Sequence, residues 1–317
     1  MGRWDKKKKK YTLRKDMQSR LDSYLKNGKN SSRDKDKNNK EDLAQNKIYS
    51  YVTYKNYKKS CYKFADYLFH NNKEVRQLKD LKIKHVNNYL QYLVVKGYSA
   101  PTINSSKAAI AKLMQISSKE FLKTPRVKRK DITRSRGMKE RDKHISKETE
   151  NYYAKFTTAI GGRRSEMEEL RGSDLIVKPL KVELKDKNGN KYVKVLSKRY
   201  PQIKIRNGKG GKERFVPIFA KNKKELAEII NTFKNAGESK VFGKLPSHFD
   251  NHFYRGEYAK RAYKKFARPI RNIRDKKEVY YCREERKGDA FDRNAMLIAS
   301  KFLGHNRVDV IARHYLY

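Results

Sequence analysis

Hydrophobic residues recur at helical spacing between residues 44 and 118. Tyrosine, phenylalanine and leucine side chains fall at steps of three to five residues over 51–68, and the stretches 78–93 and 103–114 repeat the pattern. Thr102 is the predicted N-cap of the third helix. This region is therefore expected to be a small all-helical domain.

The first 43 residues are mostly polar and rich in lysine, asparagine, serine and aspartate. Four apolar side chains at four-residue spacing favour a short helix over 11–25, but residues 27–39 hold too little apolar surface to fold alone. We therefore expect residues 1–43 to be a flexible basic arm, which either contacts DNA or is only a solvated leader.

After residue 148 the pattern changes from purely helical to mixed. Two strand pairs are predicted, because apolar residues alternate on either side of Asn188-Gly189 and of a second glycine-rich turn at 207–211. The fold class is therefore mainly α with a small antiparallel β-sheet (α+β), and residues 148–317 form the second domain. The predicted elements are helices 148–160, 223–235, 251–267 and 292–303, a further helical segment after Pro246, and strands 180–183, 192–196, 202–205 and 214–218.

Residues 119–147 separate the two domains and show almost no apolar periodicity. A basic run within them can follow a DNA backbone, or it can be an ordinary solvated linker. Its candidate DNA-binding residues are Arg126, Lys128, Arg129 and Lys130.

The charge balance sets the class of partner. The chain has 317 residues, with 80 Lys+Arg against 35 Asp+Glu and a formal net charge of +45, and the excess is spread over both domains and the linker. Such a charge predicts a polyanionic partner, above all nucleic acid. The 37% hydrophobic content is sufficient for folded cores, so the chain is not wholly disordered.

The apolar runs and the cysteine content of the sequence bear on the cellular location of the protein. No apolar run is long enough to span a bilayer or serve as a signal peptide, and the two cysteines cannot form a disulfide framework. We expect a cytoplasmic protein with no membrane partner, associated with the nucleoid when it is bound to DNA.

Short motifs in the second domain contain the candidate chemistry. Gly161-Gly162 lead into a helix that begins near Arg163, where free backbone N–H groups and a guanidinium would both favour a phosphate. Lys209 lies in a glycine-rich turn between two predicted strands, where a lysine can serve as a general acid. This turn lacks the GK[ST] of a nucleotide-binding loop.

Two further motifs follow toward the C-terminus. His252 and Arg255 are spaced i, i+3 on one helical face, so both can reach the same phosphate. Acidic and cysteine partners for a metal are missing there, so no metal site is predicted. His305 follows Leu303-Gly304, and Tyr315 lies near the end of the chain.

The order of these motifs resembles the catalytic domain of the tyrosine recombinase (phage integrase) family. That family has an arginine in Gly-x-Arg-x-x-Glu, a hairpin lysine, a His-x-x-Arg box, a Leu-Gly-His box and then a tyrosine nucleophile. The helical region 44–118 is similar to the family's core DNA-binding domain. The matching residues are Arg163, Lys209, His252, Arg255, His305 and Tyr315.

The resemblance implies a site-specific recombinase that cleaves and rejoins DNA through a 3′-phosphotyrosyl intermediate and a Holliday junction. Tyr315 would attack, Arg163 and Arg255 would neutralise the phosphate, Lys209 would protonate the leaving oxygen, and the two histidines would orient the phosphate. Glu166 would support the pocket from behind. The implied partners are a double-stranded recombination site, a homotetramer and accessory DNA-bending proteins, with no metal or other cofactor, in the context of a mobile genetic element.

Three alternatives remain open from the sequence. They are a type IB topoisomerase, which shares the chemistry, a catalytically inert DNA-binding protein of the same fold, and an RNA-binding scaffold. The chain also departs from the family pattern by an additional hairpin at 180–196 and a basic insertion at 268–293, and Tyr317 is a second candidate nucleophile.

Overall fold

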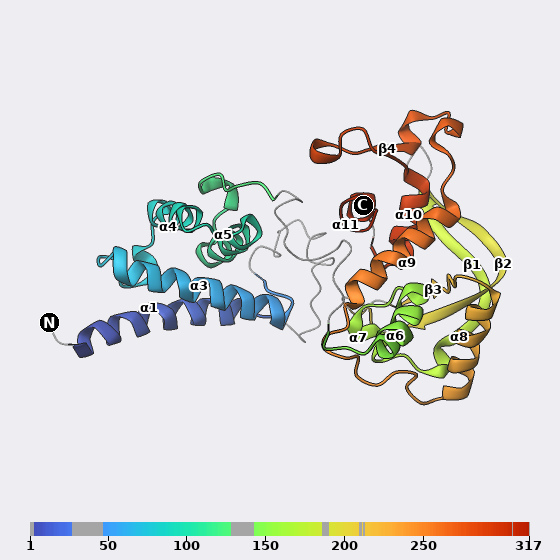
Figure 1. Cartoon of the computed structure of the whole chain (residues 1–317). Coiled ribbons are helices and arrows are strands. Elements are labelled where there is room, and N and C mark those ends of the chain that lie inside the picture. Colours follow the sequence, from blue (N-terminus) through green and yellow to red (C-terminus); the bar gives the residue numbers. More distant parts are fainter. Residues whose placement is uncertain are drawn as a thin grey trace. The chain divides into compact units, whose positions relative to one another are not determined.

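The computed structural model describes residues 3–26, 47–127, 143–185, 190–208, 211, 213–305 and 307–316. The chain divides into two compact units, Met1–Asp131 and Ile132–Tyr317, and each has its own hydrophobic core (Figure 1).

The N-terminal unit is helical in all its described elements. α5 begins one turn earlier than predicted, with Ser99 as its N-cap, because Pro101 is tolerated in the first turn of a helix; the predicted cap at Thr102 is therefore wrong. The elements are α1 (Arg3–Tyr24), α3 (Tyr51–Asn71), α4 (Ile83–Val95) and α5 (Ala100–Met114), with short 3-10 turns η2 (Leu78–Asp80) and η3 (Ser118–Glu120).

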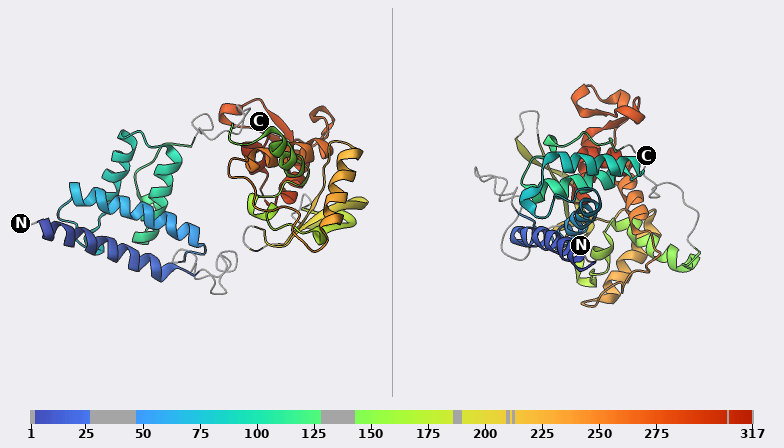
Figure 2. Two further views of the ribbon diagram at one scale, coloured as in Figure 1. Left: turned by 60° about the horizontal axis from the view of Figure 1, so that its bottom comes forward. Right: turned by 90° about the vertical axis from the view of Figure 1, so that its left-hand side faces the viewer.

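The N-terminal segment is part of this core, at least from residue 12 to residue 26. α1 lies along α3 in both views (Figures 1 and 2), and Leu13, Met17 and Leu21 are buried between the helices. Arg14 forms an ion pair with Asp66 of α3. The predicted flexible arm is therefore wrong for this stretch, because the four-residue apolar spacing builds a packed helix; residues 27–46 lie outside the described part.

The N-terminal unit also extends into the predicted linker. Phe121 is only 3% exposed in the same core, and the backbone N–H of Leu122 donates to the Asn87 side chain over 2.8 Å. Residues 119–122 therefore belong to the folded unit, whereas residues 128–142 lie outside the described part of the chain.

The C-terminal unit combines helices with two small antiparallel sheets. Its helices are α6 (Lys147–Ile160), α7 (Arg164–Met167), α8 (Lys223–Ala236), α9 (Asn251–Phe266), α10 (Arg293–Phe302) and α11 (Val308–His314), with 3-10 turns η4 (Gly172–Asp174), η5 (Ile270–Asn272), η6 (Lys276–Glu278) and η7 (Glu284–Arg286). Its strands are β1 (Leu175–Lys185), β2 (Lys191–Ile205), β3 (Arg214–Pro217), β4 (Val279–Tyr281) and β5 (Ala290–Asp292). The predicted α+β class is confirmed.

The two predicted strand pairs form one sheet of order β1-β2-β3. β2 is continuous and pairs antiparallel with both neighbours, and Ile205 lies opposite Arg214 where β3 begins. The glycine-rich segment between Ile205 and Arg214 therefore connects two paired strands, as the sequence pattern predicts.

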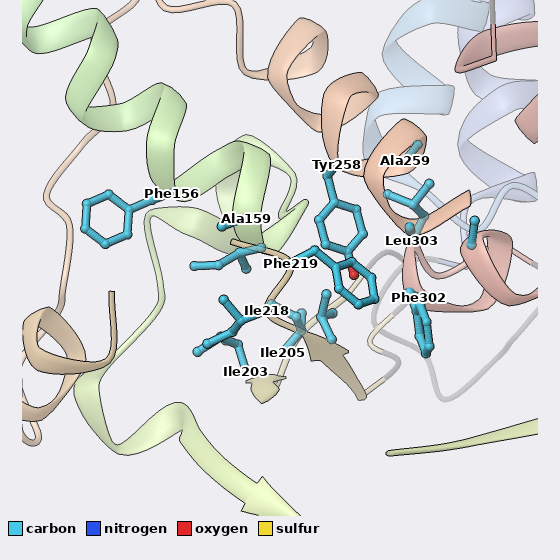
Figure 3. Packing of buried hydrophobic residues seen from close by; sticks show 14 of the residues in the cluster. Phe156, Ala159, Ile203, Ile205, Ile218, Phe219, Tyr258, Ala259, Phe302 and Leu303 are labelled. Carbon is cyan, nitrogen blue, oxygen red and sulfur yellow. The ribbon is translucent and has the colours of Figure 1, made fainter. Parts of the chain in front are cut away.

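Aromatic and aliphatic side chains from the sheet, α6, α9 and α10 fill the core of this unit (Figure 3). Tyr258 of α9 stacks on Phe219 with ring centroids 5.4 Å apart, and Phe219 also contacts Phe302 at the end of α10. Leu303 is fully buried beside them. The end of α10 is therefore anchored in the core immediately before Gly304 and His305.

Three segments of this unit differ from or add to the prediction. Residues after Pro246 form a turn and not a helix, because the Arg164 guanidinium donates to the carbonyls of Leu245, Pro246 and Phe249. The basic insertion contains the antiparallel hairpin β4–β5, and α11 is a helix that the sequence pattern did not predict.

Candidate active site

Arg255 is a buried arginine on the inner face of α9. Its side chain is 3% exposed, and its guanidinium donates to the carbonyls of Gly161 and of Leu303, the latter over 2.5 Å. Burial lowers the pKa of Arg255, while the nearby Tyr315 and Glu166 act in the opposite sense. An arginine stays protonated under these conditions, so a positive charge is fixed inside the unit.

Arg163 lies at the N-cap of α7 and points to the same place. Its Nη1 donates to Glu166 Oε1 over 2.6 Å, and its Nη2 lies 3.5 Å from the Leu303 carbonyl that also binds Arg255. The backbone N–H of Arg163 donates to Glu166 Oε2 over 2.8 Å. The expectation that this N–H would be free for an anion is therefore wrong, because the carboxylate of the same short helix occupies it.

Glu166 connects the arginines of the site. Its carboxylate is 2% exposed and accepts two parallel hydrogen bonds from Arg214, over 2.9 and 2.7 Å, besides those from Arg163. Burial alone would raise the pKa of Glu166, but hydrogen bonds and charge attraction from Arg214 and Arg163 lower it to about 2. The ionised carboxylate thus holds guanidinium groups from two separate elements.

Arg214 was not among the predicted site residues. It stands at the start of β3 and also donates from Nε to the Phe302 carbonyl over 3.3 Å. The sequence contained a signal for it, because Arg214 ends the basic, glycine-rich stretch 208–214 that also contains Lys209. Its contact with Glu166 becomes apparent only in the folded structure, where β3 brings the two side chains together.

Tyr315 lies beside the arginines, immediately after α11. The residue is 4% exposed, and its hydroxyl is 3.5 Å from His305 Nε2. The exposed His252 ring stacks on the Tyr315 ring with centroids 5.8 Å apart and an interplanar angle of 16°. A phenol oxygen, two imidazoles and buried guanidinium groups are therefore gathered in one region.

Several predicted residues cannot be placed in this geometry. Lys209 and Tyr317 lie outside the described residues, as do Lys128, Arg129 and Lys130. Arg126 is described and is exposed at the end of the N-terminal unit. Among the described residues, no cluster of three or more histidine, cysteine, aspartate or glutamate side chains could hold a metal ion. None of the described helices has the length and apolar character needed to cross a membrane.

A protein-family model matches part of the chain. Residues 34–122 fit the family model described as phage integrase, N-terminal. Over this segment the chain is similar to the N-terminal domain of phage integrases. The predicted resemblance to the tyrosine recombinase (phage integrase) family is confirmed over this segment, which includes α3, α4 and α5 of the N-terminal unit.

Solved structures with remote similarity include an integrase and a recombinase. One is the Tn1549 transposon integrase in complex with transposon right-end DNA, at 12% identity and a TM-score of 0.38, with 83% of this chain and 89% of that chain covered. Another is the XerH site-specific recombinase bound to difH substrate, at 14% identity and a TM-score of 0.39, with 96% and 91% covered. No curated protein matches the sequence significantly.

Proposed function

We propose that this integrase-family protein is a site-specific DNA recombinase that cleaves and rejoins DNA through a tyrosine. The observation that carries the proposal is the placement of Tyr315 at 3.5 Å from His305 Nε2 and next to the buried guanidinium of Arg255. A nucleophile, a proton-accepting group and fixed positive charge are the components that phosphodiester transfer requires.

In the proposed reaction the Tyr315 oxygen attacks a DNA phosphorus atom and the bond to the 5′-oxygen breaks. His305 is the nearest group to receive the phenolic proton, and Lys209 is assigned to protonate the departing 5′-oxygen. The product is a 3′-phosphotyrosyl link and a free 5′-hydroxyl, and the reverse attack by a 5′-hydroxyl rejoins the strand. The phosphotyrosyl bond retains the energy of the broken bond, so no nucleotide cofactor is assigned.

Arg163 and Arg255 are assigned to the non-bridging phosphate oxygens. Two guanidinium groups would supply the charge stabilisation that a metal ion provides in other phosphoryl-transfer enzymes. The shared Leu303 carbonyl and Glu166 support this assignment, because they hold both side chains before DNA arrives. Such preorganisation avoids a reorganisation cost in the transition state.

The DNA partner is supported by the net charge of +45 and by the family match of residues 34–122. Each phosphate contact releases counterions, so affinity is expected to fall steeply with salt. We assign a homotetramer to the synaptic complex, in which strands are exchanged in pairs through a Holliday junction, and a mobile genetic element as the biological context.

A suicide duplex that carries the recognition site tests the cleavage step. The wild-type protein is expected to form a covalent protein–DNA band in the presence of EDTA, and the band should disappear in Tyr315→Phe but persist in Tyr317→Phe. Arg163→Ala should still bind the duplex without cleaving it. A band that persists in Tyr315→Phe would refute the assignment of the nucleophile.

A further inference from the structure

The helix that leads to Tyr315 is short and incompletely bonded at its end. α11 has seven residues, and the backbone N–H groups of Tyr315 and Leu316 both donate to the Ile311 carbonyl over 3.0 Å. The N–H of Leu316 is therefore not directed at the Ala312 carbonyl, its usual helical partner. A helix of this length has little stability of its own and depends on contacts with the rest of the fold.

Arg286 donates to the Ala312 carbonyl in place of the Leu316 N–H, although it lies 26 residues earlier in the sequence. It lies between β4 and β5, at the end of η7, and its Nη1 donates to the Ala312 carbonyl over 2.8 Å. The segment that contains β4 lies close to α11 in Figure 1. The hydrogen bond therefore joins the hairpin insertion to the last turn of the helix before the tyrosine.

The guanidinium of Arg286 is itself held in place. Its Nε donates to Asp289 over 2.7 Å, and its Cζ lies 5.1 Å from the centre of the Phe291 ring. The side chain is 21% exposed, so solvent screens the contact only in part. A cation fixed at a helix C-terminus is favourable, because the unpaired carbonyls there carry partial negative charge.

The hairpin is connected to the active site at its other end as well. Val279 of β4 pairs with Asp292 of β5, and the Asp292 side chain caps the first turn of α10. α10 then leads directly to Leu303 and His305. The hairpin thus touches the start of the helix that precedes His305 and the end of the helix that precedes Tyr315.

From this geometry we propose that Arg286 is a positioning residue for the nucleophile, which holds α11 so that the Tyr315 hydroxyl stays at His305. The proposal rests on the function assigned above to Tyr315. Arg286 acts through the Ala312 carbonyl, three residues before the tyrosine, and it is not assigned a contact with DNA. It gives the basic insertion 268–293 a role that its sequence did not reveal.

The test compares Arg286→Ala with the wild-type protein in two measurements. Single-turnover cleavage of the suicide duplex at saturating protein should slow about 10- to 100-fold, the effect of losing one charge-assisted hydrogen bond. The dissociation constant for the duplex should stay within about twofold of the wild-type value. Amide hydrogen exchange without DNA should accelerate over 308–316 and remain unchanged over 293–302.

Two further variants separate positioning from charge and from folding. Lys287→Ala removes one positive charge from an exposed neighbour in the same turn and should behave as wild type. Arg286→Lys should recover part of the cleavage rate, because an amine can donate to the same carbonyl. If Arg286→Ala does not fold, Arg286→Gln is judged by the same criteria.

Wild-type cleavage by Arg286→Ala, or slow cleavage with unchanged exchange over 308–316, would overturn the proposal. If the wild-type protein itself forms no adduct, the function assigned to Tyr315 fails. The exchange measurement still decides in that case whether Arg286 holds α11.

Discussion

The buried carboxylates of Asp292 and Glu166 in the C-terminal unit both bind arginines, and they differ in charge balance. Asp292 is fully buried, caps α10 and binds one guanidinium, that of Arg268, through both oxygens over 2.7 and 3.0 Å. Glu166 is equally inaccessible, but it binds Arg163 and Arg214, and the Arg255 guanidinium lies 3.9 Å away. The first site is neutral as a pair, whereas the second keeps an excess of positive charge.

Such a difference is expected between a structural ion pair and the phosphate site proposed above. Arg268 has a second acidic partner, Glu278, so its charge is fully compensated. The arginines around Glu166 donate their other hydrogen bonds to main-chain carbonyls and not to further carboxylates. A carbonyl group orients a guanidinium without cancelling its charge. A phosphate oxygen would complete this arrangement, because it would pair with the uncompensated guanidinium groups.

Arg255→Ala is expected to have the largest effect on chemistry. It removes one of the two guanidinium groups assigned to the phosphate, and the cleavage rate should fall on the order of 10²- to 10³-fold. The measurement is the rate of adduct formation on the suicide duplex. Arg268→Ala is the matched control, which should lower the melting temperature but cleave within about threefold of wild type. Equal losses of cleavage in both variants would remove the distinction.

Glu166→Gln should weaken the dependence of folding stability on pH. The folded-state pKa of Glu166 is about 2, below its ordinary value, so ionised Glu166 stabilises the fold above pH about 4.5. That contribution, about 3 kcal/mol, decreases as the pH falls from about 4.5 toward 2. Urea unfolding at several pH values should show a steeper loss of stability in wild type than in Glu166→Gln over this window. Parallel curves for the two proteins would contradict the result.

Gly161→Ala tests the main-chain contribution to the arginine site. Gly161 has φ of +67°, and an added Cβ would lie 2.3 Å from a ring carbon of Tyr258. Its carbonyl accepts from Arg255. We expect a loss of at least about 2 kcal/mol of stability, from left-handed strain plus this collision.

Gly211→Ala is the control for backbone strain alone. It has a similar φ of +71° with open space around the missing Cβ, so thermal unfolding should report a loss of only about 1 kcal/mol. If the two glycine variants lost equal stability, contact with Tyr258 would not matter.

Arg307→Ala should have the smallest effect. Arg307 pairs with Asp309 over 2.6 Å, but its side chain is 71% exposed. Exposed pairs of this kind contribute little, so the free energy of unfolding should hardly change and cleavage should be unaltered. A large loss of cleavage would indicate that Arg307 belongs to the active site.

Local patterns in the sequence were sufficient for most of the helices and for the general composition of the site. The apolar spacing of Leu13, Met17 and Leu21 predicted a helix. The i, i+3 spacing of His252 and Arg255 predicted that both side chains would reach the same site. What the pattern missed was the context that decides burial. Residues 1–43 were expected to form a flexible arm, yet the buried apolar side chains of α1 pack it against α3.

The remaining features depend on contacts between distant segments. Nothing local to Arg214 indicates that it would meet Glu166, 48 residues earlier, because that meeting requires the register of β2 and β3. The same holds for Arg286 and Ala312. Carbonyl acceptors are especially hard to predict, since every residue has one and only the fold determines which of them faces a guanidinium.

The Leu303 carbonyl accepts from Arg163 and Arg255, and this has a consequence for evolution and engineering. A main-chain oxygen cannot be deleted by replacing a side chain, so the anchor for both arginines is insensitive to most point mutations. The adjacent Gly304 is the vulnerable position, because it has φ of +70° and an added Cβ would lie 3.2 Å from the Arg214 side chain. A substitution at Gly304 is therefore expected to disturb the anchor of both arginines more than most side-chain replacements around it.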